Sequence, residues 1–226
     1  MELGDTPDAR PVYQKLVEIL PDSALGYEGI GSVYLREGKL KEAIPPYKKA
    51  LTIDTNAPTL SNLGTTYFFL RQYDEAVKWY ERSVQINASQ SEELWGNLGD
   101  AYRWTGQTDK ALAAYRKTIT LAKMNANSQS ANNLGDLGLL YAKMGDQAQA
   151  VRSTTLARTK APNDLQLIYY EGEVYALLGQ PLKAIAAYRL AVAKGWLREE
   201  VWNDPENAKL QSMPEFVELC RTKPKK

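Results

Sequence analysis

Histidine is missing from this 226-residue sequence, and cysteine occurs once, at Cys220. Without histidine the chain has no histidine general base, histidine-activated nucleophile or histidine metal ligand. A single cysteine excludes a disulfide within the chain, and Cys220 reads as a structural thiol because it follows Leu219 in an apolar context. No phosphate-binding loop or dinucleotide fingerprint is present either. We therefore predict no enzymatic activity, no catalytic residues, no metal and no cofactor.

An excess of charge and long apolar runs are missing as well. The chain carries 28 Lys and Arg against 27 Asp and Glu, a net charge of +1, which disfavours a nucleic acid or an acidic membrane as partner. It has no apolar run of membrane-spanning length, and its first residues lack the basic and apolar regions of a secretory signal. These absences favour the cytoplasm. With 44% hydrophobic residues, the chain can still bury a continuous core.

A pattern centred on glycine returns five times along the chain. In each copy a Tyr follows the Gly by 3 residues, an Ala by 12, and a Tyr (in the fourth copy a Thr) by 16. The glycines are Gly31, Gly64, Gly99, Gly138 and Gly172, which lie 33, 35, 39 and 34 residues apart. A period near 34 indicates a helical repeat array.

One copy shows why the pattern predicts two helices. Apolar residues from Glu92 to Trp104 recur at the spacing of one helix face, and Gly106 supplies a left-handed stop. A second helix is predicted from Asp109 to Leu121. Gly99 is small where the two helices approach, and Tyr102 and Tyr115 fill the space beside it. One such pair cannot bury its own apolar face, so neighbouring pairs must stack.

These residues resemble the tetratricopeptide repeat (TPR) family over nearly the whole chain. The resemblance implies an all-α fold, a right-handed α-solenoid of antiparallel helix pairs with C-terminal capping helices. We expect a single array with the second helix of a truncated repeat at 1–23, full repeats at 24–56, 57–90, 91–130, 131–164 and 165–197, a cap at 198–222 and a tail at 223–226. Because the first helix of the first repeat is missing, we infer that the sequence is a piece of a longer protein and that Met1 comes from cloning.

Two local features within the array depart from the regular pattern. Pro45 and Pro46 fall inside a predicted second helix, so we expect a kink there or a late start near Glu42. Residues 124–129 hold the extra length behind the spacing of 39 and predict a longer loop or an extended helix.

After residue 197 the period fails. The sequences Asn203-Asp204-Pro205-Glu206 and Ser212-Met213-Pro214-Glu215 each predict the capped start of a short helix. This ending also resembles C-terminal repeat domains of large bacterial signalling proteins, of the serine/threonine kinase or transcriptional regulator type. The second resemblance is short.

In the TPR family the first helices of successive repeats line a concave groove, and the resemblance implies such a groove here. The residue before each Leu-Gly, and those three and seven later, share one helix face. The predicted groove residues are Asn62, Thr65, Phe69, Asn97, Asp100, Trp104, Asp136, Lys143, Tyr170 and Glu173.

Two of these features favour a peptide ligand. Asn62 and Asn97 are equivalent, and an amide can both donate to and accept from an extended backbone; Asp136 breaks the series. The aromatic residues offer apolar anchors. A structural reading stays open, since Asn before Leu-Gly is frequent in the family and the aromatics can pack between repeats. The mixture of acids and bases on this face departs from the basic clamp of chaperone-tail receptors.

We therefore predict a non-enzymatic module that binds a protein or peptide partner in its groove. The alternative is an intramolecular regulatory or structural domain of a larger bacterial signalling protein.

Overall fold

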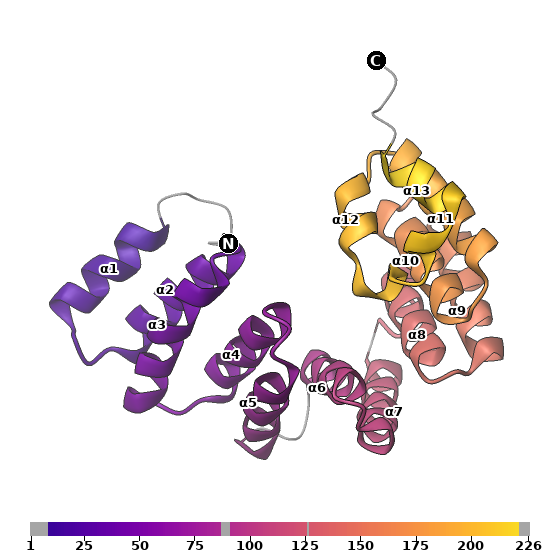
Figure 1. Ribbon diagram of the computed structural model, residues 1–226. Helices are drawn as coiled ribbons and strands as arrows, with labels where there is room; N and C mark the ends of the chain where they lie inside the picture. The colour runs from indigo at the N-terminus through magenta and orange to yellow at the C-terminus, as the bar shows by residue number, and fades with distance from the viewer. Residues whose placement is uncertain (1–8, 87–90, 126, 222–226) are drawn as a thin grey trace. The chain divides into compact units, whose positions relative to one another are not determined.

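Figure 1 shows the computed structural model of the chain, which describes residues 9–86, 91–125 and 127–221. Every regular element in these ranges is a helix, which confirms the predicted all-α class built from helix pairs. The chain divides into two compact units, residues 1–121 and 122–226, and each is described by itself. The predicted tail at 223–226 lies outside the described residues, and the predicted division into repeats stays a prediction.

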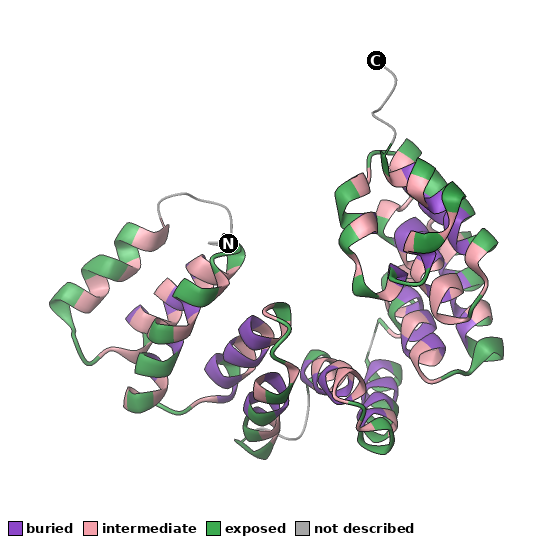
Figure 2. Ribbon diagram, viewed as in Figure 1, coloured by how far each residue is buried: buried purple, intermediate pink, exposed green. Residues whose placement is uncertain are grey.

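The first unit is built from helices that follow one another along the chain. They are α1 (Ala9–Ile19), α2 (Ala24–Arg36), α3 (Leu40–Ile53), α4 (Ala57–Phe69), α5 (Tyr73–Ile86), α6 (Glu92–Trp104) and α7 (Thr108–Met124), the last of which continues into the second unit. Each helix from α1 to α5 packs against the next one along the chain. Figure 2 shows that α1 has no buried residue, whereas α4 buries much of its surface.

The second unit holds two more helix pairs and a terminal cap. Its elements are α8 (Ala131–Lys143), α9 (Gln147–Lys160), α10 (Leu165–Leu177), α11 (Pro181–Ala193), α12 (Arg198–Asn203), the 3₁₀ turns η1 (Pro205–Asn207) and η2 (Leu210–Ser212), and α13 (Pro214–Arg221). The predicted capped start at Asp204 opens only a 3₁₀ turn, and the additional helix α12 precedes it. Val201, Leu210, Phe216 and Leu219 of the cap pack on Ile168, Ile185 and Tyr188.

A contact between glycine and tyrosine holds the two helices of most pairs together. A Cβ atom on Gly99 would lie 2.6 Å from Cε1 of Tyr115, closer than side chains tolerate, and a Cβ atom on Gly64 would lie 2.7 Å from Cδ1 of Tyr80. The rings of Tyr80 and Tyr115 are almost wholly buried. The first helix therefore lies directly on the ring, which only a residue without a side chain permits.

The fourth pair keeps the glycine but replaces the tyrosine. Thr154 of α9 lies against Gly138 of α8, and its hydroxyl is buried without a hydrogen-bond partner among the described residues. A buried hydroxyl without a partner loses its bonds to water and gains none in return, so this position costs stability.

The helix turns repeat one backbone conformation. Four of them place glycine in the left-handed region, at Gly38, Gly106, Gly145 and Gly179, with φ between 68° and 77°. In the turn between α4 and α5 the equivalent residue is Arg71, with φ 59°. A side chain is unfavourable in this conformation, so Arg71 carries local strain.

Of the two expectations for the proline-containing helix, a kink or a late start near Glu42, the late start is wrong. α3 begins at Leu40 and runs through Pro45 and Pro46. The two prolines leave the carbonyls of Lys41 and Glu42 without their usual intrahelical donors. Both of those residues are exposed, so water can replace the lost hydrogen bonds.

The extra residues between the third and fourth glycines extend a helix and lengthen a turn. α7 has 17 residues, against 14 in each of α3, α5 and α9. After it, Ser128 and Ser130 donate backbone hydrogen bonds to Asn125 and Asn127. Both predicted outcomes, an extended helix and a longer loop, therefore occur.

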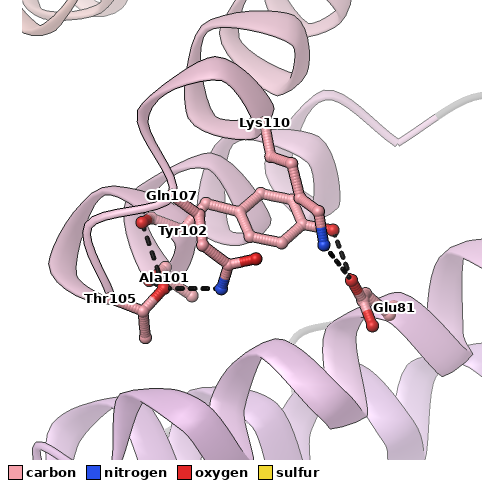
Figure 3. Close-up of polar contacts among 6 residues, drawn as sticks. All are labelled: Glu81, Ala101, Tyr102, Thr105, Gln107 and Lys110. Carbon is pink, nitrogen blue, oxygen red and sulfur yellow. Dashed lines mark hydrogen bonds and ion pairs between the residues drawn. The ribbon is translucent and has the colours of Figure 1, made fainter.

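Figure 3 shows how the second repeat is tied to the third. The hydroxyl of Tyr102 donates to a carboxylate oxygen of Glu81 at 2.6 Å, and the Lys110 ammonium lies 3.5 Å from the same oxygen. The Lys110 ammonium also lies 5.0 Å from the centre of the Tyr102 ring. One carboxylate on α5 thus accepts from both helices of the next pair.

Replacing Gly99 with alanine should lower the free energy of unfolding by about 1–3 kcal/mol, because the new methyl group overpacks against the Tyr115 ring. Gly96→Ala on the same helix is the matched control: its Cβ would meet nothing closer than 3.8 Å, so helix propensity should make it neutral or stabilising by about 0.5–1 kcal/mol. Chemical denaturation of both variants measures the difference. Equal stabilities would contradict the assigned contact.

Arg71→Gly should raise the free energy of unfolding by about 1 kcal/mol, because glycine adopts the left-handed conformation without the cost of a Cβ atom. The reciprocal Gly106→Arg variant should lose a similar amount. Melting temperatures of the two variants, compared with the parent chain, check the prediction. A destabilised Arg71→Gly variant would show that the arginine side chain contributes more than its backbone strain costs.

The stability of the first unit should fall as the pH rises from 10 to 12. Burial is the main cause that raises the pKa of Tyr47 from 10.0 to about 12. The folded state therefore keeps this proton longer than the unfolded chain does. The stabilisation is complete below pH 10 and is lost through pH 12. Thermal melts with tyrosinate absorbance test this, and Tyr47→Phe should show a shallower dependence. A Tyr47→Phe variant whose stability falls with pH as steeply as that of the parent chain would refute the prediction.

Candidate functional site

The predicted groove residues of the first unit lie on α4 and α6. Asn62, Thr65, Asn97, Asp100 and Trp104 are half-buried. Phe69 is 61% exposed. The first helices α2, α4 and α6 contact one another in order, so the structure brings the predicted residues of α4 and α6 onto neighbouring helices.

A cavity of about 250 Å³ lies between the amino-terminal halves of α4 and α6. It is lined by Ala57, Pro58, Ser61, Asn62, Ser83, Ser91, Glu93 and Leu94. Asn56 and Ser91 accept the backbone N–H groups of Thr59 and Leu94, at 2.9 and 3.1 Å, and so fix where the two helices begin. The cavity therefore combines hydroxyl, amide and carboxylate groups with a short apolar wall.

The two predicted asparagines keep their amides available. Within the described part of the chain, neither the Asn62 nor the Asn97 side chain makes a hydrogen bond. Each asparagine lies two residues before the glycine that packs on a tyrosine. The two amides therefore occupy equivalent positions in successive repeats. An amide can pair with both the N–H and the C=O of another backbone.

Thr65 and Asp100, by contrast, are engaged inside their own repeats. The Tyr80 hydroxyl lies 2.9 Å from the Thr65 hydroxyl, and the Tyr115 hydroxyl donates to Asp100 at 2.6 Å. Burial, and then the nearby charge of Asp100, raise the pKa of Tyr115. Tyr115 thus stays protonated and donates its hydrogen bond to Asp100, the residue that follows Gly99. Sequence periodicity placed Thr65 and Asp100 on the groove face but missed these bonds.

Aromatic side chains gather at the carboxyl-terminal ends of α4 and α6. The Tyr73 and Trp104 rings stack with centroids 5.4 Å apart, and Phe68 meets Tyr73 edge-on at 5.2 Å. Phe69 meets Phe68 edge-on, and the Arg103 guanidinium lies 5.0 Å from the Trp104 ring centre. A cavity of about 450 Å³ beside Trp104 also includes Arg71 and Tyr73. Phe69 and Trp104 therefore belong to an aromatic cluster rather than standing alone.

In the second unit the structure brings three predicted residues together. Burial, followed by the charges of Asp136 and Glu173, raises the pKa of Tyr170 to about 12. Asp136 is exposed, while Tyr170 and Glu173 are half-buried. Lys143 is half-buried on α8 and, like Asp136 and Glu173, is engaged with other groups of the chain.

In the fifth repeat the cap supplies the hydrogen-bond partner of the buried tyrosine. The Tyr188 hydroxyl donates to Asn207 at 2.8 Å, and the Asn207 amide donates to the carbonyl of Val201 at 3.0 Å. Tyr169 stacks on Trp196 with centroids 4.3 Å apart and donates to Asp204. Sequence reasoning missed this arrangement, although the Asn203-Asp204-Pro205-Glu206 sequence marked the segment that makes it.

The described residues also differ from what a metal site or a reactive thiol requires. They contain no group of three or more acids and thiols arranged to hold a metal ion. Cys220 is half-buried, and burial raises the pKa of its thiol, which favours the unreactive form. Within the described ranges, no helix has the length and hydropathy needed to span a bilayer.

Family models described as tetratricopeptide repeat match residues 1–58, 57–89 and 90–159. BBSome complex member BBS4 of Bos taurus is 23% identical over 202 residues, which is 89% of this chain and 38% of that protein. The chain therefore spans well under half the length of this curated relative.

Solved structures show the same fold. A tetratricopeptide repeat protein from Parabacteroides merdae superposes with a TM-score of 0.68 at 18% identity, over 94% of this chain and 81% of that one. YrrB, a TPR protein with an unusual peptide-binding site, superposes with a TM-score of 0.56 at 21% identity, over 83% of this chain and 94% of that one. The chain belongs to the tetratricopeptide repeat family, whose repeats serve as protein-interaction modules.

Proposed function

We propose that this chain binds an extended peptide segment of a partner protein along α4 and α6 of its first unit. The observation that carries the proposal is the pair of equivalent amides, Asn62 and Asn97, which make no hydrogen bond among the described side chains and backbone groups. An extended backbone presents alternating N–H and C=O groups, and a free amide can satisfy one of each.

The surroundings of the two amides support a peptide over other ligands. Asn62 opens into the cavity of about 250 Å³ between α4 and α6, where hydroxyl groups can meet further backbone groups. At the other end of the same helices, Phe69 and Trp104 offer apolar surface for a side chain of the ligand. The net charge of +1 gives no general attraction for a nucleic acid.

The bound peptide would not need to displace the hydrogen bonds of Thr65 and Asp100. These residues hold the tyrosines of the second helices, so we assign them to the floor of the groove rather than to direct contact with the ligand. Asp136, Lys143, Tyr170 and Glu173 of the second unit stay proposed groove residues, with Tyr170, Asp136 and Glu173 forming one polar group.

Replacing Asn62 and Asn97 with alanine together should weaken peptide binding at least about tenfold, the effect expected when two backbone-pairing groups are lost. The melting temperature should not change, because neither amide makes a hydrogen bond to a described residue of the chain. Peptides selected from a displayed random library on the parent chain supply the ligand, and their dissociation constants are then measured for each variant.

Asn132→Ala is the matched control, since Asn132 is an exposed asparagine on the first helix α8 but lies outside the predicted groove positions. It should bind the selected peptides like the parent chain. A double variant that binds them as tightly as the parent would refute the proposed role of the amides. Failure to select any peptide would contradict the proposed function itself.

A further inference from the structure

A third cavity, which we call the α8–α9 cleft, lies in the second unit on a face other than the predicted groove. It has a volume of about 320 Å³. It is lined by Lys123, Ser128, Gln129, Leu134, Leu137, Tyr141, Gln149, Arg152, Ser153 and Leu156. The predicted groove residues of α8, Asp136 and Lys143, are not among them. Ser128 and Gln129 come from the inserted residues that lengthen the spacing between the third and fourth glycines.

The charges around the α8–α9 cleft are of one sign. Lys123 and Arg152 are both exposed, and no carboxylate lines the cavity. Neither side chain forms an ion pair within the described ranges, and the Lys123 ammonium lies 5.7 Å from the centre of the Tyr141 ring. Two cations without counter-charges at one opening favour an anionic ligand.

The cleft also has an apolar wall that a simple inorganic anion would not use. Leu134 and Leu137 are buried at the wall, and Leu156 is 39% exposed beside them. Ser153 contributes a small, buried side chain to the lining, at the position that Trp79 takes in the second repeat and that Ala114 and Ala187 take in the third and fifth. Ser153, Gln149 and Tyr141 add hydrogen-bonding groups between the apolar wall and the cations.

We propose that the α8–α9 cleft is a second docking surface, which binds an acidic segment of a partner protein with an apolar side chain between its carboxylates. The carboxylates pair with Lys123 and Arg152, and the apolar side chain covers Leu134, Leu137 and Leu156. This site does not depend on the peptide groove of the first unit, because it shares no residue with it.

The test uses the full chain and a short capped peptide of alternating glutamate and leucine, with binding followed by fluorescence anisotropy. The parent chain should bind this peptide, and Arg152→Glu should weaken binding at least about tenfold. Lys160→Glu is the matched control: it reverses an exposed charge on the same helix but outside the cleft, and it should leave the affinity within about twofold. A peptide with glutamine in place of glutamate should bind at least about tenfold more weakly.

Several results would overturn the proposal. They are no binding to the parent chain, equal losses in Arg152→Glu and Lys160→Glu, or equal affinity for the glutamine peptide. The Asn62→Ala, Asn97→Ala variant separates the two sites, because it should bind the acidic peptide like the parent. Loss of the acidic peptide in that variant would place its binding in the first unit and refute the cleft.

Discussion

The contact between a glycine of the first helix and a tyrosine ring of the second is the constraint on which the rest of each repeat depends. It sets how closely the helices approach, since Gly64 and Gly99 leave no space for a methyl group against Tyr80 and Tyr115. It also fixes where the tyrosine hydroxyl ends, beside the residue that follows the glycine. The same tyrosine side chain thus packs its ring against the glycine and makes a hydrogen bond through its hydroxyl.

This arrangement decides which groups of the first helix remain available to a ligand. The tyrosine binds the residue after the glycine, whether that residue is Thr65 or Asp100. The residue two before the glycine lies on the same helix face, one turn before the residue that binds the tyrosine. The tyrosine hydroxyl does not bond to it. In the second and third repeats that residue is Asn62 or Asn97, so the free polar groups of the face are amides. In the fifth repeat Asn207 of the cap takes the hydroxyl instead.

The sequence was sufficient for the helix pairs, because the small residue, the ring and their spacing of 16 recur in each copy but the fourth. It also put Asn62, Asn97 and Trp104 on the first helices that contact one another. It did not reveal the bonds of Thr65 and Asp100, because helical periodicity gives the face of a residue and not the direction of a distant hydroxyl. Nor did it reveal the role of Asn207, since the repeat pattern that guided every other assignment ends before the cap.

The left-handed turn at Arg71 could have been predicted from the sequence. Its position lies seven residues after the repeat glycine, where each of the other copies has a second glycine, so the left-handed turn could have been inferred by comparison. The α8–α9 cleft could not be predicted from the repeat pattern, because Ser128 and Gln129 of its lining belong to the inserted residues.

The most direct test of the account is a nuclear magnetic resonance titration that follows the side-chain amides of Asn62 and Asn97 as a selected peptide is added. The account predicts that both amide signals shift and saturate with the dissociation constant of the peptide, as expected when free amides acquire backbone partners. If the peptide binds while both signals stay in place, the amides do not contact the ligand and the proposed groove is wrong.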